Sequence, residues 1–305
     1  MSDRPTETLH PASTGLHAVP AAQALSCLLA AQLAAVQALS GVLPALQAAA
    51  DAAARALQGG GRLAYAGAGS SGLMALSDAL ELAGTFGIPP ARTPVLFAGG
   101  VAALIHMQGG VEDDLSLATT DVNRLAPGKG DAVICVSASG STPYTLAVAQ
   151  AARAAGAAVI GIANVPGAAL LTAATHPVLI ETGAEVVCGS TRMGAATAQK
   201  VALNMLSVLV GIRLGAVHDG LMVDVVADNA KLRDRAARIV AAIAGTGEDR
   251  ARDALTASGG LVKIAVLVAR GLTPDAAARA LAESGGHLAP HLEHWVQRNG
   301  PERSA

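Results

Sequence analysis

The spacing of apolar and polar positions changes near residue 62. Residues 21–57 are nearly all helix formers, with Ala and Leu at helical spacing that Gly41 and Pro44 interrupt, and this pattern predicts two helices. From Arg62 onward, short β-branched or apolar runs end in Gly or Ser and alternate with helical stretches. The runs predict strands at 62–66, 94–98, 131–137, 158–163 and 177–180.

Strands that alternate with helices require right-handed crossovers, so the pattern predicts an α/β fold with a parallel, five-stranded, doubly wound sheet. A long helix is expected from about Thr191 to Leu214, and the chain beyond Asp224 has helical composition. In this tail Thr273 is a suitable helix cap, with Pro274 at the first helical position. We expect an N-terminal helical segment at 1–57, the sheet domain at 58–223 and a C-terminal helical region at 224–305.

Two loops at predicted strand ends carry Gly and hydroxyl residues. Gly67–Gly72 follows the first strand and Ser137–Pro143 follows the third, and each loop leads into a helix. Glycine lets the backbone approach an anion, while free N–H groups and the helix dipole favour negative charge. These loops indicate a phosphate site with candidate ligands Gly69, Ser70, Ser71, Ser137, Ser139, Ser141 and Thr142. The simpler alternative is a pair of ordinary turns with capping serines.

The first loop also satisfies the G-x-G-x-x-G pattern of dinucleotide-binding turns. Ribose recognition would need an acidic residue at the end of a second strand, and residues 82–88 present none. Two hydroxyl-rich loops fit a compact phosphate better than a dinucleotide.

Proton transfer on a phosphate-bearing substrate needs acid/base groups, and two glutamates lie near the loops. Glu81 is near the end of the helix that leaves the first loop, and Glu112 follows the pair Gly109-Gly110. A single Glu in such a fold is usually a solvated surface charge, so the pattern alone does not choose between them.

Composition narrows the classes of partner. The net charge is −2 and aromatic residues make up 2% of the chain, which argues against a nucleic-acid partner and favours a small molecule. There is no uninterrupted apolar run of about 18 residues, so no membrane span is expected. The N-terminus lacks a secretory pattern, and we expect a cytoplasmic protein with Cys27, Cys135 and Cys188 reduced.

Other catalytic classes find little support. His287, His291 and His294 form a close histidine set, but Pro290 interrupts the helix that a zinc pair would need, so we expect no metal site. A nucleophilic Ser or Cys has no identifiable partner histidine, and no G-x-S-x-G turn is present.

A series of motifs resembles, in order and almost end to end, the N-acetylmuramic acid 6-phosphate etherases of the sugar isomerase (SIS) domain superfamily. The motifs are Tyr65–Gly72, Asp78–Glu81 with Thr85–Gly87, Glu112–Asp114, Ala138–Tyr144, Glu185–Met193 with Thr197–Lys200, Leu203–Ser207, and Leu221–Asp224 with Asn229–Arg233. Shorter matches lie at Thr6–Thr8, Pro11–Ser13 and Gly285-Gly286. The superfamily also includes phosphosugar isomerases and the glucokinase regulatory protein.

This resemblance implies cleavage of a D-lactyl ether to give N-acetylglucosamine 6-phosphate and D-lactate, without metal or organic cofactor, by a homodimer. It implies that Glu112 takes part in proton transfer at C2 and that Glu81 protonates the departing lactate. The hydroxyls of both loops would hold the phosphate, and Glu185, Ser190, Thr191 and Lys200 would complete the pocket.

The chain departs from the family pattern at three basic positions. Leu73 and Ser141 replace arginines, and Gly194 replaces a lysine. Because charged hydrogen bonds are strong, Arg192, Lys200 and Lys231 either supply the missing charge or the substrate differs. Two alternatives therefore stay open, a lyase or isomerase for another phosphosugar and a non-catalytic sugar-phosphate-binding regulator.

Overall fold

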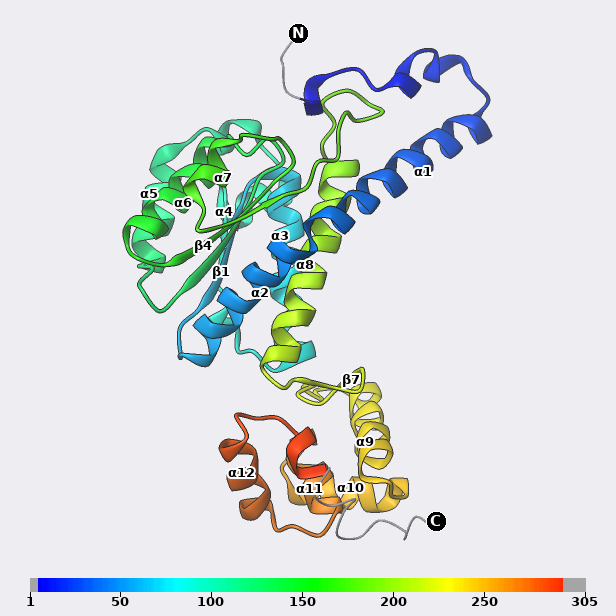
Figure 1. Cartoon of the computed structure of the whole chain (residues 1–305), viewed down its shortest axis with the longest axis vertical. Helices are drawn as coiled ribbons and strands as arrows, with labels where there is room; N and C mark the ends of the chain where they lie inside the picture. The colour runs from blue at the N-terminus through cyan, green and yellow to red at the C-terminus, as the bar shows by residue number, and fades with distance from the viewer. Residues whose placement is uncertain (1–4, 293–305) are drawn as a thin grey trace. The chain divides into compact units, whose positions relative to one another are not determined.

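The computed structural model describes residues 5–292, which form two compact units. Met1–Leu80 with Pro90–Leu209 make the first unit, and Glu81–Pro89 with Val210–Ala305 make the second (Figure 1). In this division the N-terminal helices group with the sheet. The domain boundaries after residues 57 and 223 stay predictions.

A five-stranded parallel sheet is the centre of the first unit, as the sequence predicts. Its strands have the order β2-β1-β3-β4-β5 and are joined in parallel register. The strands are β1 (Leu63–Gly67), β2 (Val95–Phe97), β3 (Ala132–Val136), β4 (Ala158–Ala163) and β5 (His176–Leu179). Every residue of β1 and β3 is buried, which is typical of strands covered on both faces.

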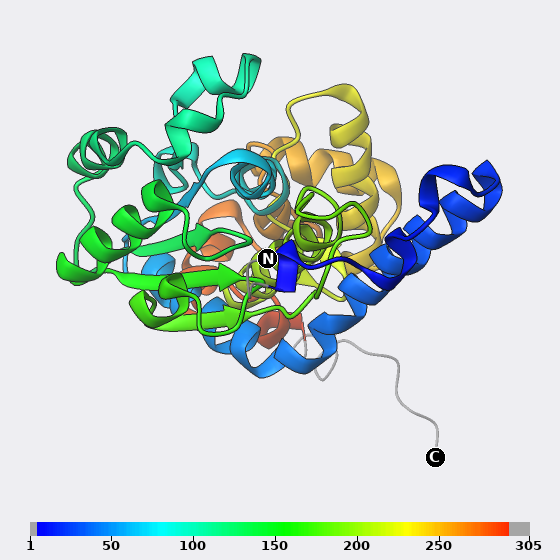
Figure 2. The ribbon, with the colours of Figure 1, turned by 90° about the horizontal axis from the view of Figure 1, so that it is seen from above.

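Helices cover both faces of the sheet (Figure 2). Alternate strand residues, among them Ala64 and Val133, point into an apolar cluster that Tyr144 and Val148 of α6 complete. Tyr65 points to the opposite face, where its hydroxyl meets α3. The helices around this sheet are α2 (Leu43–Gln58), α4 (Gly100–Ile105), α5 (Leu115–Leu125), α6 (Pro143–Ala154) and α7 (Ala169–Ala173), with the 3-10 turns η5 (Pro90–Arg92) and η6 (Gly109–Glu112).

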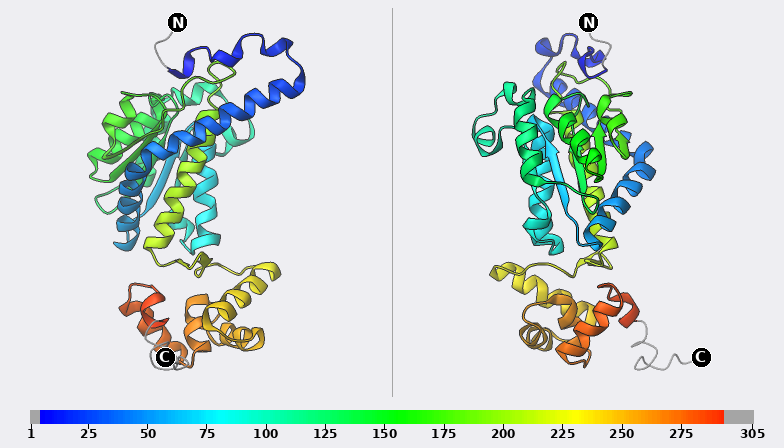
Figure 3. Two further views of the ribbon diagram at one scale, coloured as in Figure 1. Left: turned by 45° about the vertical axis from the view of Figure 1, so that its right-hand side comes forward. Right: turned by 90° about the vertical axis from the view of Figure 1, so that its left-hand side faces the viewer.

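Two long helices, α3 (Gly69–Phe86) and α8 (Gly194–Arg213), run alongside each other (Figure 3). Polar contacts join them because the Asn204 amide and the Ser207 hydroxyl both donate to Asp78. Further along, Gly211 lies so close to the Phe86 ring that an added Cβ would stand 2.8 Å from it. The expected long helix over 191–214 is thereby confirmed, with a start at Gly194.

The N-terminal segment forms three short 3-10 turns, helix α1 (Ala21–Gln37) and the turn η4 (Ala38–Val42) before α2. The three turns are η1 (Pro5–Glu7), η2 (Pro11–Ser13) and η3 (Leu16–Ala18). The predicted interruption at Gly41 and Pro44 is therefore present, with Pro44 in the first turn of α2. Leu25, Leu29 and Leu33 are each at least 60% exposed, so residues 5–292 leave one face of α1 without apolar cover.

Two helical stretches, Ala21–Gln58 and Gly194–Arg213, are long and apolar enough to span a membrane by length and composition. The core helix of a globular protein passes the same test, and 56% of the apolar window in α8 is buried inside the protein. For the first stretch that share is 11%.

The C-terminal part of the second unit is a helical bundle with its own apolar core. Its elements are the antiparallel pair β6 (Val217–His218) and β7 (Leu221–Met222), then α9 (Ala230–Ala244), α10 (Glu248–Ala257), α11 (Val262–Ala269) and α12 (Pro274–Glu283). The predicted cap is confirmed, since Thr273 Oγ1 accepts from Ala276 N at 3.3 Å and Pro274 begins α12.

Candidate active site

The first predicted anion loop is the tight turn between β1 and α3. Gly69 has φ +53°, a conformation that glycine adopts at little cost. Gly72 must also lack a side chain, because a Cβ would stand 2.7 Å from the Phe97 ring. Ser70, partly buried, and Ser71, buried, are in the first turn of α3, so both residues lie at the positive end of the helix.

The second loop is a closely connected set of hydroxyls between β3 and α6. Ser137 Oγ accepts from Gly140 N at 3.0 Å and lies 2.8 Å from Thr142 Oγ1. Ser139 Oγ accepts from Ser141 N at 3.2 Å and from the Ser141 hydroxyl at 3.1 Å. The left-handed residue Gly140 (φ +61°) closes the turn.

A direct hydrogen bond joins the two loops. Ala138 N donates to Ser71 Oγ at 3.2 Å. The contact follows from the topology, because β1 and β3 are parallel neighbours and their carboxyl ends meet at one edge of the sheet. The structure therefore brings the candidate phosphate ligands of both loops together.

Glu112, the last residue of η6, lies against the start of α3. A Cβ added to Gly69 would stand 2.5 Å from Glu112 Oε1, so the carboxylate occupies the space that the glycine leaves open. Burial, and to a lesser extent the neighbouring Asp113, raise the pKa of Glu112 above its usual value. This glutamate is a partly buried group beside the anion loops, and a raised pKa makes its carboxylate a stronger base.

Glu81 lies near the C-terminal end of α3, away from the first loop. Its side chain is exposed, and it follows Gly69 by twelve residues of one continuous helix. At the rise of an α-helix this separation is about 18 Å between the two Cα atoms. Measured along α3, the Glu81 backbone is therefore remote from the turn that Glu112 contacts.

Glu185 is a buried carboxylate that supports α8. Its two oxygens accept from Gly194 N at 2.9 Å and Ala195 N at 2.8 Å, which satisfies free N–H groups of the first turn. Ser190 and Thr191 are partly buried in the turn that precedes this helix. A direct contact of these three residues with substrate stays a proposal.

The N-terminal segment packs on this turn. Gly189 N donates to Thr6 O at 3.2 Å, and the Glu7 carboxylate lies over Gly189, where an added Cβ would meet Oε2 at 3.0 Å. Glu7 was not among the predicted site residues. The only sequence signal for it was the family-like Thr6-Glu7-Thr8.

Lys200 is exposed on α8, and its Nζ donates a hydrogen bond to Asn204 Oδ1.

The three departures from the family pattern lie in different places. Leu73 is partly buried on α3, and Ser141 belongs to the second loop. Gly194 is buried, and an added Cβ would be 3.1 Å from both Ala35 Cβ and Glu185 Oε2. The start of α8 therefore packs tightly against α1, which gives a physical reason for a small residue at 194.

Sequence reasoning did not single out two buried amides near the second loop. Gln199 Nε2 donates to Asn164 Oδ1 at 2.8 Å, and Asn164 Nδ2 donates to Ile180 O at 3.0 Å. Asn164 N donates to Ala138 O, so this chain of amides leads to the second loop. A pattern search for charged or hydroxyl residues passes over such supporting amides.

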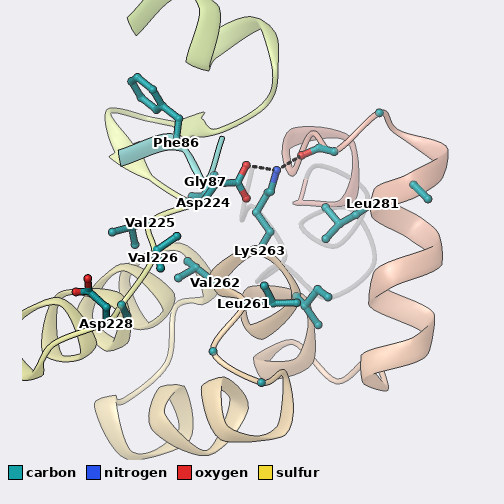
Figure 4. Close-up of a pocket in the computed structure, with 18 residues that line it drawn as sticks. Phe86, Gly87, Asp224, Val225, Val226, Asp228, Leu261, Val262, Lys263 and Leu281 are labelled. Carbon is teal, nitrogen blue, oxygen red and sulfur yellow. Dashed lines mark hydrogen bonds and ion pairs between the residues drawn. The ribbon is translucent and has the colours of Figure 1, made fainter. Parts of the chain in front are cut away.

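The second unit has a pocket of about 730 Å³ around an ion pair (Figure 4). Lys263 Nζ lies 2.6 Å from Asp224 Oδ2 and donates to Gly286 O at 3.0 Å. Burial raises the pKa of Asp224, an effect that Lys263 opposes. The pocket contains none of the predicted site residues.

Within residues 5–292, no group of three or more His, Cys, Asp or Glu side chains is arranged to hold a metal ion. His291 Nε2 lies 3.0 Å from Ser284 Oγ. His294 of the predicted histidine set is outside the described residues.

Comparison with known proteins gives a consistent result. An SIS domain family model matches residues 32–164. An N-acetylmuramic acid 6-phosphate etherase of Deinococcus radiodurans is 46% identical over 285 residues, 93% of each chain. The enzyme of the same name from Streptomyces coelicolor is 47% identical over 81% of this chain and 79% of its own, and that from Serratia proteamaculans is 39% identical over 93% and 96%.

Among solved structures, a phosphoheptose isomerase from Francisella tularensis aligns with a TM-score of 0.50 at 20% identity, over 62% of this chain and 97% of its own. This likeness supports the fold of the sheet domain. The sequence identity to the etherases over nearly the whole length shows the family as well as the fold. The chain belongs to the N-acetylmuramic acid 6-phosphate etherase family.

Proposed function

We propose that this protein cleaves the D-lactyl ether of N-acetylmuramic acid 6-phosphate, giving N-acetylglucosamine 6-phosphate and D-lactate. Relatives of that name, 46% identical over 93% of the chain, support the proposal. The observation that carries it is local, namely a partly buried carboxylate, Glu112, against the glycine turn of an anion site.

The reaction is an elimination followed by hydration. In the ring-opened sugar the aldehyde acidifies the C2 proton, which Glu112 removes as the C2–C3 double bond forms and the C3–O bond breaks. Glu81 gives a proton to the departing lactate oxygen. Water then adds to the unsaturated aldehyde, with hydroxyl to C3 and hydrogen to C2, so the net change consumes one water. Each step uses general acid/base catalysis and no cofactor.

Phosphate binding falls to the two joined loops. An anion at this edge would be bound by backbone N–H groups at the start of α3 and by hydroxyls of both loops, namely those of Ser70, Ser71, Ser139 and Thr142. Ser137 and Ser141 hold the hydroxyl set together, and Lys200 supplies positive charge on the neighbouring helix.

The length of α3 determines how the two glutamates act together. A glutamate side chain reaches only a few ångströms, whereas about 18 Å of helix separates Glu81 from Gly69. One sugar ring is too small to span that separation. We therefore propose a homodimer in which each active site takes Glu112 from one copy and Glu81 from the other.

Mixed dimers test this proposal. The wild-type chain is expected to release lactate from the muramic acid phosphate, while Glu81→Ala and Glu112→Ala are each inactive. Unfolding both variants together and refolding them forms mixed dimers with one intact composite site each. Half of the dimers are then mixed and have one of two sites intact, so about a quarter of wild-type activity returns.

Two outcomes contradict different parts of the proposal. If the pure, folded wild type releases no lactate, the proposed reaction is contradicted. Binding of a sugar phosphate without C2 exchange would then favour a regulator. If the wild type is active but the mixture of variants regains no activity, both glutamates belong to the active site of one chain. Mixing each variant with a Glu81→Ala, Glu112→Ala double variant is the matched control, and it regains no activity.

A further inference from the structure

A buried carboxylate, Asp78, joins three elements of the first unit. It lies on α3 and is 3% exposed. Its Oδ2 accepts from Tyr65 Oη of β1 at 2.9 Å, and its Oδ1 accepts from Asn204 Nδ2 and Ser207 Oγ of α8, both at 2.9 Å. Each carboxylate oxygen thus has at least one donor.

Within residues 5–292, no cation forms an ion pair or hydrogen bond with this carboxylate. The nearby Lys200 ammonium donates to Asn204 Oδ1 and not to Asp78 itself. Burial raises the pKa of Asp78, while the hydrogen bonds from Tyr65, Ser207 and Asn204 and the charge of Lys200 lower it. A charge buried in this way is costly, and an apolar residue of similar size would pack α3 against α8 at lower cost. The directional hydrogen bonds are what distinguish aspartate at this position.

Those bonds fix how α3 is rotated about its axis. Donors from β1 meet one carboxylate oxygen and donors from α8 meet the other, so α3 cannot turn or slide without breaking at least one of them. Residue 81 follows Asp78 by three positions, close to one turn of the same helix. The direction in which the exposed Glu81 side chain leaves α3 is therefore set at Asp78.

We propose that Asp78 is a positioning residue that aims Glu81 at the departing lactate oxygen. The inference rests on the proposed function and adds to it the residue that supports the acid. The anion turn at Gly69 has its own contacts, since Glu112 lies beside it and the Ser71–Ala138 hydrogen bond joins it to the second loop. Loss of the Asp78 contacts therefore affects protonation of lactate more than proton removal at C2.

The test is Asp78→Asn, which keeps the size of the side chain and removes its charge. In heavy water, C2 exchange and lactate release are measured on the same sample of the muramic acid phosphate. We expect lactate release to fall about tenfold or more relative to C2 exchange, because small misplacements of catalytic groups have large effects on rate. Tyr65→Phe and Ser207→Ala, which each remove one donor, are expected to give smaller changes of the same ratio.

Asp131→Asn is the matched control. Asp131 is also a buried carboxylate of this unit, 8% exposed, and it accepts from Arg62 N at 2.8 Å, but it precedes β3 at the opposite edge of the sheet. This variant is expected to lose stability while keeping the wild-type ratio of lactate release to exchange. Equal falls of both rates in Asp78→Asn, as in a merely destabilised protein, would overturn the inference.

Amide hydrogen exchange provides a readout that does not depend on the reaction. In Asp78→Asn we expect faster exchange of the backbone amides of residues 79–86 than in Asp131→Asn at matched stability. Unchanged protection in this part of α3 also overturns the inference, even if the wild-type chain proves to be inactive on the proposed substrate. An inactive wild type by itself counts against the proposed function alone.

Discussion

The carboxylate of Glu112 fills the space beside the Cα of Gly69, at the point where the first anion loop becomes helix α3. An added Cβ at residue 69 would stand 2.5 Å from Glu112 Oε1, and the backbone there has φ +53°. One missing side chain therefore lets a candidate base and a candidate phosphate turn share the same corner of the sheet.

Gly69→Ala tests this relationship. The new Cβ forces Glu112 away and strains the backbone by about 1–2 kcal/mol. We expect C2 exchange and lactate release to fall together by about a hundredfold, because a displaced base affects the first chemical step. Steady-state assays and thermal unfolding of the purified variant check both effects.

Gly60→Ala is the control for backbone strain alone. Gly60 also has a positive φ, +84°, but a Cβ there would meet nothing within 4 Å. This variant is expected to lose similar stability and to keep its activity. Equal activity losses in the two variants would show that strain, and not contact with Glu112, explains the effect at Gly69.

The pH dependence of exchange is a second prediction. Burial is the main cause of the raised pKa of Glu112, and Asp113 adds to it. A base must be ionised, so C2 exchange is expected to rise with pH through this raised pKa. Asp113→Asn removes the smaller cause, so the acidic limb of the pH–rate profile moves to lower pH. A shift to higher pH, or none, contradicts the assignment of Glu112 as base.

The hydroxyl set of the second loop gives a third prediction. Ser137→Ala removes the acceptor for Gly140 N and the neighbour of Thr142. A hydrogen bond to a charged group contributes about 1.5–3 kcal/mol, so KM for the sugar phosphate is expected to rise about tenfold or more with a smaller change in kcat. Ser26→Ala, an exposed hydroxyl bonded to Ala22 O on α1, is the control. An unchanged KM in Ser137→Ala would show that the phosphate does not bind at this loop.

The ion pair in the second unit gives a fourth prediction. Lys263→Met leaves Asp224 without its cation in a partly buried place, which is expected to cost about 2–3 kcal/mol of stability. Circular dichroism melting checks this loss, and Lys231→Met, at an exposed position on α9, is the control. Equal melting temperatures for the two variants would mean that the pair contributes no net stability.

The fold could be predicted well from the sequence because its signals are local. Short β-branched or apolar runs mark all five strands, and Thr273 with Pro274 marks the start of α12. The two anion loops were also found, since strand, glycine turn and helix follow each other directly along the chain.

The site was harder to predict because its contacts are long-range. Gly69 begins the connection from β1 to β2 and meets Glu112 in the next connection, from β2 to β3, and Glu185 caps a helix that begins nine residues later, so neither contact follows a sequence period. Glu81 shows the opposite difficulty. Its motif was recognised, but the motif does not indicate how far the continuous helix α3 separates residue 81 from the first loop.

The hydrogen bond between Ser71 and Ala138 has a consequence for the choice of ligand. Because Ser71 Oγ accepts the backbone N–H, its hydroxyl hydrogen stays free to donate, and this part of the loop offers a donor to an anion. Such a surface prefers a doubly ionised phosphate, which offers acceptors alone, to its monoprotonated form. Affinity is therefore expected to weaken on acidification through the second ionisation of the sugar phosphate, near pH 6.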